Sequence, residues 1–387
     1  MPCDFTYYTP TKLLFGKGAL YRLPALVSPY GKKLLIVYGG GSIKKSGIYD
    51  HMRAAFVGFD LVDFGGVAPN PKYEENVKAG IAVCKREQVD AVLAVGGGSV
   101  VDCAKSICAG AFYAGEPWDI ISGKVRAERV LPLFVVLTLS ATGSEFNNGS
   151  VISRPQSHDK LCFKDDRLCP VASVLDPDYT CTVSGRQTAA GIVDGISHVL
   201  EQYFCGESSL LTDGMCEATI RCLMDNVPRV MKNPADEKAR GEIMLCCTLA
   251  CNGILSIGNA PSGWPCHAIE HALSGFYDIV HGEGLAIVTP AWMRYILSNE
   301  TLPRFVAYGK HVWGINDLSD AEIAAQSIAR TEEFFASLGM PKRLEDVGIG
   351  TDRLDDMAQH IAQTEGLERA WVPLSEQDVL QILRDCL

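Results

Sequence analysis

The stretch AVGGGSVVDCAK, residues 94–105, decides how the chain is expected to fold. It starts in an apolar run, passes through three consecutive glycines and continues with a helical pattern. A buried strand, a tight turn and a helix in this order form the repeating unit of a parallel α/β sheet. The glycines allow close backbone approach by a bound group, and the helix N-terminus offers N–H groups to an anion.

Further apolar runs repeat this unit through the first half of the chain. KLLIVY (33–38), VDAVLAV (89–95) and LFVVLTL (133–139) are each followed by a Gly-rich or Ser/Thr-rich turn, and VASVLDP (171–177) also ends in a turn. Such runs are typical of buried strands, and ligands gather at the carboxyl ends of the strands in such sheets. We therefore predict an α/β domain with a mostly parallel sheet over residues 1–183.

The hydrophobic period changes after residue 183. Ser184 and Gln187 have the spacing of a capping box, and the apolar residues that follow recur at helical spacing. The segments 241–256 and 317–339 are also helical in pattern, and no strong strand signal returns. Residues 184–387 are therefore predicted to form an all-helical domain.

The composition narrows the partners and the compartment. The formal net charge is −11, from 46 acidic and 35 basic side chains, which argues against a nucleic-acid or anionic-membrane partner. No signal peptide is visible, and no apolar run reaches the ~18 residues of a membrane span. The 15 cysteines include no C-x-x-C pair and are expected to be reduced, mostly buried thiols. A cytoplasmic location is predicted.

The segment DGISHVLEQYF, residues 194–204, places polar groups in an otherwise apolar helix. Asp194 and His198 stand at i and i+4, His267 and His271 share that spacing in HAIEH, and His281 follows. One carboxylate with several imidazoles would suit zinc or ferrous iron. Hydrogen-bonded core histidines and a buried Asp–His ion pair are the alternative.

Two further turns carry candidate ligand groups. LSATGSEFNN (139–148), together with the residue before it, places the hydroxyls of Thr138, Thr142 and Ser144 after a strand, although these groups would also suit turn and cap positions. In YGGGSIKKS (38–46), small residues at 39–42 precede two lysines, with no carboxylate to repel a 2′-phosphate. This pattern favours NADP(H), and a surface turn with solvated lysines is the alternative.

Several segments in this order resemble the iron-containing, or metal-dependent, alcohol dehydrogenase family, within it the NADP-dependent butanol dehydrogenase and aldehyde reductase branch. The resemblance runs nearly the whole length of the chain. The segments that carry it are TPTKLLFGKGAL (9–20), YGGGSIKKSG (38–47), FGG and APNP within 64–71, GGGSVVDCAK (96–105), LTLSATGSE (137–145), VLDPDYT (174–180) and DGISHVLEQY (194–203).

The resemblance implies a nicotinamide dinucleotide on the N-terminal domain, one divalent metal on the helical domain, and an active site in the cleft between them. The metal ligands implied are Asp194, His198, His267 and His281. His271 is implied to lie near the substrate and is the candidate proton donor, with solvent as the alternative. The predicted cofactor-binding residues are Gly39, Gly40, Gly41, Ser42, Gly97, Gly98, Ser99, Asp102, Thr138, Thr142, Ser144, Asn147, Lys160 and Tyr179, with Asp102 expected to hold the glycine turn.

The function expected from the resemblance is NADPH-dependent reduction of short to medium aliphatic aldehydes, and the reverse reaction, by a homodimer with Fe²⁺ or Zn²⁺ polarising the carbonyl. The side chains expected to make the pocket apolar are Trp264, Ile269, Leu273 and Phe276. Three alternatives stay open: an NAD-dependent polyol dehydrogenase of the glycerol type, a metal-dependent lyase on the same fold, and a hydrolase that uses a metal-bound water.

Overall fold

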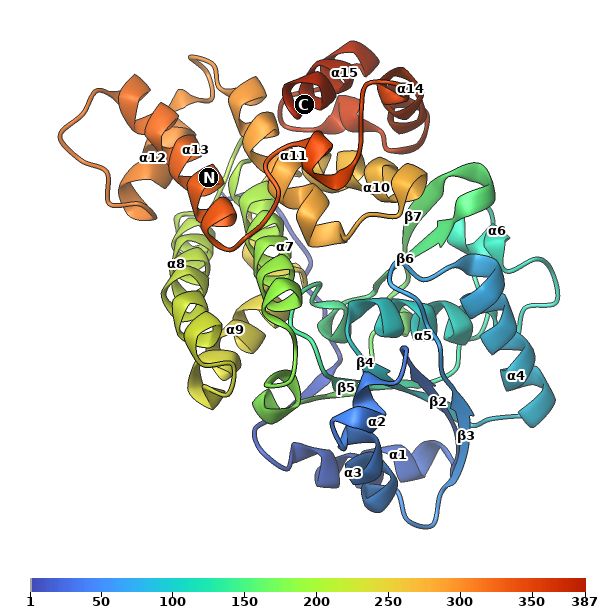
Figure 1. Ribbon diagram of the computed structural model, residues 1–387. Helices are drawn as coiled ribbons and strands as arrows, with labels where there is room; N and C mark the ends of the chain where they lie inside the picture. Colours follow the sequence, from blue (N-terminus) through green and yellow to red (C-terminus); the bar gives the residue numbers. More distant parts are fainter. Residues whose placement is uncertain (1) are drawn as a thin grey trace. The chain divides into compact units, whose positions relative to one another are not determined.

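The computed structural model describes residues 2–387 (Figure 1). Within them the strands are β1 (Lys12–Phe15), β2 (Lys33–Tyr38), β3 (Asp60–Phe64), β4 (Ala91–Gly96), β5 (Leu133–Leu137), β6 (Gly149–Arg154), β7 (Asp159–Lys164) and β8 (Ala172–Leu175). The α-helices are α1 (Leu23–Val27), α2 (Ser42–Lys45), α3 (Ile48–Ala55), α4 (Ala79–Glu87), α5 (Gly98–Gly110), α6 (Trp118–Ile121), α7 (Gly185–Tyr203), α8 (Leu210–Lys232), α9 (Glu237–Ala250), α10 (Pro265–Tyr277), α11 (His281–Ile296), α12 (Leu302–His311), α13 (Asp320–Ser337), α14 (Leu354–Thr364) and α15 (Glu376–Asp385). None of the helices in this described part is long and apolar enough to cross a membrane.

A six-stranded parallel sheet has the order β1-β8-β5-β4-β2-β3. The predicted α/β fold with a parallel sheet is therefore confirmed. A separate antiparallel pair, β6 with β7, has Gly149 opposite Lys164 and Arg154 opposite Asp159. This pair was not predicted from the sequence.

Alternate side chains of the central strands enter two apolar layers. Leu35 and Val37 of β2 belong to a buried cluster with α4 and α5, whereas Leu34 and Ile36 belong to a cluster with α1 and α3. Figure 1 shows these helix pairs on opposite faces of the sheet. Burial on both faces explains why the strands read as continuous apolar runs rather than as alternating ones.

The strand order reverses between β2 and β4, because β3 lies beside β2 on one side and the chain then returns to the other. In open α/β sheets, ligands bind at the carboxyl ends of the strands at such a reversal. The turns that follow these two strands are residues 39–42 and the start of α5 at Gly97 and Gly98. The fold thus places both predicted cofactor turns at the position that sheet topology favours.

By their contacts the described residues form two compact units. The sheet unit comprises residues 8–184 and 228–252, and the helical unit comprises residues 2–7, 185–227 and 253–387. Residues 228–252, which the sequence placed in the helical domain, group with the sheet because Met244 of α9 packs on Leu137 and Leu175. As a statement about domains, the predicted division at residue 184 stays a prediction.

Candidate metal and cofactor sites

Helix α7 carries three polar side chains on one face. Asp194, His198 and Glu201 stand at i, i+4 and i+7, and each is 5% exposed or less. Their apolar neighbours Val193 and Val199 are also buried. The helix is buried on almost every side, so its polar face must find partners within the protein.

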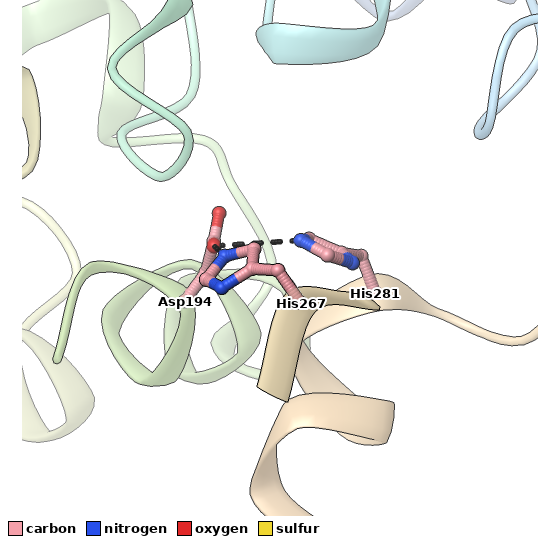
Figure 2. Close-up of side chains that lie close together, drawn as sticks. All are labelled: Asp194, His267 and His281. Carbon is pink, nitrogen blue, oxygen red and sulfur yellow. Dashed lines mark ion pairs between the residues drawn. The ribbon is translucent and has the colours of Figure 1, made fainter. Parts of the chain in front are cut away.

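Two other helices bring histidines to this face. His267 lies in the first turn of α10, which begins at Pro265, and His281 is the first residue of α11. Figure 2 shows the side chains of Asp194, His267 and His281 converging. Asp194 Oδ1 lies 3.1 Å from His198 Nδ1, 3.7 Å from His267 Nε2 and 3.6 Å from His281 Nε2.

The geometry fits a small divalent cation. The candidate ligand atoms of Asp194, His267 and His281 all lie within 4.8 Å of one another. Asp194 Oδ1 and His267 Nε2 are buried without a hydrogen-bond partner, which is costly unless another group satisfies them. Carboxylate oxygen and imidazole nitrogen are donors that zinc and ferrous iron accept. The structure therefore brings Asp194, His267 and His281 into one group of candidate ligands, whereas His198 lies beside Asp194 but outside that group. The set of four ligands stays a prediction.

The charges of this cluster support one another. Burial alone would raise the pKa of Asp194, but the neighbouring imidazoles hold the pKa of that carboxyl well below its usual value. Burial alone would lower the pKa of His267, yet the carboxylates of Glu201 and Asp194 raise it to about 9. A cation would therefore find an ionised carboxylate and would displace the proton that His267 holds.

Two carboxylates lie behind the histidines and were missed from the sequence. Glu201 pairs with His267 Nδ1, and Glu270 pairs with His281 Nδ1. Both side chains have 0% exposure. The position of Glu201 could have been found, because it continues the i, i+4, i+7 face of α7, whereas the contact of Glu270 with α11 depends on tertiary packing.

His271 lies beside the cluster. It is 8% exposed, and its ring centroid is 6.4 Å from that of His267 and 5.9 Å from that of His281. Its Nδ1 lies 3.8 Å from Glu365 Oε1. It also forms a second acid–histidine group with Glu270 and His281. His271 thus lies next to two of the predicted metal ligands.

The predicted apolar pocket is only partly supported. Ile269 and Leu273 have 0% exposure and belong to the core of α10. Trp264 is half-buried, and its ring meets His198 and His267 edge-on at 5.8 and 5.4 Å. Phe276 is half-buried at the other end of α10, against His360 at 5.8 Å. Of these four side chains, Trp264 contacts the histidine cluster.

The turn after β2 is open and basic. Gly40 and Ser42 are exposed, Gly39 and Gly41 are half-buried, and Gly41 has φ 101° ahead of α2. The ammonium of Lys44 lies 4.8 Å from the ring centroids of Tyr38 and Tyr49. Asp63 is a carboxylate near this turn, and its Oδ2 accepts a hydrogen bond from the Tyr49 hydroxyl at 2.6 Å.

The glycine turn after β4 depends on tight packing. A Cβ atom on Gly96 would lie 2.5 Å from Val100 Cγ2, and one on Gly98 would lie 2.5 Å from Thr142 Cγ2. Ser99 and Thr138 are half-buried beside the turn, as is Thr142. No side chain caps the N-terminus of α5, and the N–H groups of Val100 and Val101 donate to the Gly97 carbonyl at 3.0 and 3.2 Å. A helix N-terminus of this kind attracts a phosphate.

Three of the predicted cofactor residues take part in a buried polar network around Lys105. The ammonium donates to Ser144 Oγ at 3.0 Å, to Asn147 Oδ1 at 2.8 Å and to the Gly149 carbonyl at 2.7 Å. Ser144 Oγ in turn donates to Asp102 Oδ1 at 2.6 Å. These side chains fix the loop after β5. The central place of Lys105 in the network was not predicted from the sequence.

The last two predicted cofactor residues lie in different surroundings. Lys160 is 6% exposed in β7, and Tyr179 is 7% exposed in the apolar cluster that contains α1 and α3. Burial raises the pKa of Tyr179 to about 12. Tyr179 thus packs as a core side chain, and its predicted contact with a cofactor stays a prediction.

A parallel sheet with glycine turns at its strand reversal and a helical unit with an Asp–His cluster are the features expected of a metal-dependent dehydrogenase. Residues 10–177 match the iron-containing alcohol dehydrogenase family, and residues 188–387 match the C-terminal part of that family. The chain is 45% identical to the NADH-dependent butanol dehydrogenase A of Clostridium acetobutylicum over 98% of this chain and 99% of that one. It is 39% identical to an NADPH-dependent aldehyde reductase of Escherichia coli over 89% of each.

A solved structure has the same fold. The NADH-dependent butanol dehydrogenase A of Thermotoga maritima is 38% identical, with a TM-score of 0.95 over 99% of this chain and 98% of that one. The chain belongs to the iron-containing alcohol dehydrogenase family. It is an oxidoreductase of alcohols or aldehydes, and its family implies a nicotinamide cofactor and a metal.

Proposed function

We propose that the protein reduces short to medium aliphatic aldehydes to alcohols, and catalyses the reverse reaction, with one divalent ion held by Asp194, His198, His267 and His281. The observation that carries the proposal is that Asp194 Oδ1 lies within 3.1–3.7 Å of nitrogens of three imidazoles. Two of these buried atoms, Asp194 Oδ1 and His267 Nε2, have no hydrogen-bond partner. When bound, Fe²⁺ or Zn²⁺ supplies Lewis-acid polarisation of the substrate oxygen.

The chain's own residues have separate tasks in this proposal. Asp194 supplies a fixed negative charge, since its pKa is held low. His271 is the candidate donor of the proton that the product oxygen needs, because it is buried beside His267 and His281. Water is the alternative donor. Trp264 shields the cluster from one direction and offers an apolar surface to an alkyl chain.

The metal assignment is tested by His267→Ala. The variant should lose bound metal and activity together, because it removes a ligand and leaves Asp194 Oδ1 facing one fewer imidazole. Metal content per chain, measured on the purified protein, is the primary readout. Full occupancy with unchanged turnover in this variant would refute the assignment. His360→Ala, in α14, is a control expected to keep the metal.

The substrate class is tested with linear aldehydes of two to six carbons alongside glycerol and 1,2-propanediol. Each buried methylene is worth about 0.8 kcal/mol, so kcat/KM should rise by roughly fourfold per carbon until the pocket is full. The names of the butanol dehydrogenase and aldehyde reductase relatives support this reading. A polyol dehydrogenase is the second candidate, since the chain is also 30% identical to a 1,3-propanediol dehydrogenase of Citrobacter freundii. Better turnover of the diols would replace the first reading with the second.

NADPH is proposed as the preferred cofactor. The turn 39–42 carries no carboxylate, Lys44 and Lys45 follow it, and the nearby Asp63 is engaged by Tyr49. The relatives differ in cofactor: several are described as NADH-dependent, and the Escherichia coli reductase is described as NADPH-dependent. The proposal therefore rests on the local charges. At least tenfold higher kcat/KM with NADPH than with NADH is expected, and equal values would refute it. A homodimer is also proposed, which light scattering on the purified protein tests.

A further inference from the structure

Two fully buried glutamates hold the outer nitrogens of two of the proposed metal ligands. On α7, Glu201 Oε2 pairs with His267 Nδ1, while its Oε1 accepts from the backbone N–H of Cys266 at 2.6 Å. On α10, Glu270 Oε2 pairs with His281 Nδ1, while its Oε1 accepts from the hydroxyl of Ser274. In both histidines, Nε2 is the nitrogen that faces Asp194.

We infer that Glu201 and Glu270 are positioning residues that set the tautomer of His267 and His281 and thereby create the metal affinity of the site. The inference rests on the proposed function, since it takes the Asp–His cluster to be the metal centre. An ionised carboxylate only accepts hydrogen bonds, so each imidazole must keep its proton on Nδ1. The lone pair of Nε2 is then directed at the ion, and the carboxylate makes that nitrogen more basic.

The pairings also restrict how far the rings can turn. Both carboxylate oxygens of Glu201 are engaged, one by the backbone N–H of Cys266 in the first turn of α10 and one by the ring of His267. The orientation of His267 is therefore fixed jointly by α7 and by the start of α10. Glu270 packs against the start of α11, because a Cβ atom on Gly284 would lie 2.7 Å from Glu270 Cγ. Each carboxylate therefore fixes both the proton and the orientation of one ligand.

The two sites should respond differently to an amide. A glutamine at 201 cannot replace both accepting oxygens, because its NH₂ group would face either the Cys266 N–H or the Nδ1–H of His267. The ring would then lose its bond or change tautomer. A glutamine at 270 can keep both of these bonds, since the Ser274 hydroxyl can accept from the amide while the amide oxygen faces His281.

The experiment measures zinc affinity of the full-length apoprotein by competition with a chelator. Glu201→Gln should bind zinc about 10–100-fold more weakly than the wild type. Glu270→Gln should lose less affinity than Glu201→Gln. Glu217→Gln is the matched control: Glu217 is also a buried glutamate, paired with His311 Nδ1 at 2.7 Å and with the Tyr203 hydroxyl at 3.0 Å, and its variant should bind zinc like the wild type.

A second measurement needs no variant. In the zinc-loaded wild type with ¹⁵N-labelled histidine, two imidazoles should be protonated at Nδ1 and metal-bound at Nε2. Wild-type zinc affinity in Glu201→Gln, or metal bound through Nδ1 of His267, would overturn the inference. Failure of the wild type itself to bind zinc or ferrous iron would instead refute the proposed function, so the two failures are distinguishable.

Discussion

Gly282, the second residue of α11, has almost no free space around it. A Cβ atom at this position would stand 2.7 Å from the carbonyl carbon and 2.8 Å from the Cα atom of Ala190 in α7, and closer still to the carbonyl oxygen. Ordinary van der Waals contact for such an atom begins at 3.4 Å. The obstacle is backbone, so rotation of a side chain cannot relieve it. Gly282→Ala therefore forces α11 and α7 apart by roughly 1 Å.

The displacement acts directly on the proposed metal centre. His281 precedes Gly282 in α11, and Asp194 lies one helical turn after Ala190 in α7. Metal–ligand distances tolerate deviations of only about 0.2 Å, so a displacement of this size should reduce zinc affinity and lower activity by about 100-fold. The overpacking should also cost about 1–3 kcal/mol of unfolding free energy.

The assay compares Gly282→Ala with Gly214→Ala in α8. Gly214 is exposed, and a Cβ atom there meets nothing within 4 Å. The same substitution at 214 should raise the unfolding free energy by up to about 1 kcal/mol, because alanine favours the helix over glycine. Zinc titration and thermal unfolding of both variants decide the matter. Wild-type zinc affinity together with unchanged or increased stability in Gly282→Ala would show that the contact between α7 and α11 does not constrain the cluster.

Three further predictions concern the sheet unit. Hydrogen bonds from Arg167 lower the pKa of Asp165 to about 2, so this carboxylate stabilises the fold above its ordinary pKa of 3.8, and that stability is lost as the pH falls through about 2. Asp165→Asn should therefore lower the free energy of unfolding by about 1–2 kcal/mol at pH 7, a value reduced because the arginine is partly exposed. In denaturant unfolding, the difference in this free energy between variant and wild type should close as the pH falls from 4 towards 2. A difference that does not change with pH would refute this. Ser42→Asp should weaken NADPH binding while Ser42→Asn leaves it nearly unchanged, as measured by fluorescence titration, and equal effects would exclude charge as the cause. Gln88 follows the last residue of α4 and has φ 53°, so Gln88→Gly should raise the melting temperature and Gln88→Ala should not.

Much of the fold could be predicted because its signals are local. The apolar runs at β2, β4, β5 and β8 are buried on both faces, and continuous hydrophobicity follows directly from that burial. The short β6–β7 pair was missed, because its strands mix polar and apolar residues and form a two-stranded sheet of their own. The grouping of α9 with the sheet was also hidden, since it depends on where Met244 packs.

The candidate site divides in the same way. The i, i+4 spacing of Asp194 and His198 was readable, as was the i+7 position of Glu201, although the latter was overlooked. The pairing of Glu270 with His281 and the network around Lys105 join different helices and loops, so no spacing within one segment reveals them. The sequence alone also cannot tell whether an apolar residue lines a pocket or lies in the core. Ile269 and Leu273 are fully buried core residues, whereas the ring of Trp264 contacts the histidines.

The strand order has a consequence for how the chain acquires its fold during synthesis. β1 is the first strand to leave the ribosome, yet Lys12 pairs with Ala172 of β8, and at ~5–20 residues per second its partner emerges roughly 10–30 s later. The partner of Cys3 is synthesised later still, since the Cys3 N–H donates to the carbonyl of Gly258 at 2.9 Å. A strand held unpaired for that time exposes its backbone groups to other chains. The nascent N-terminal segment is therefore where we expect chaperone binding, and where slower translation between β1 and β8 would most increase aggregation.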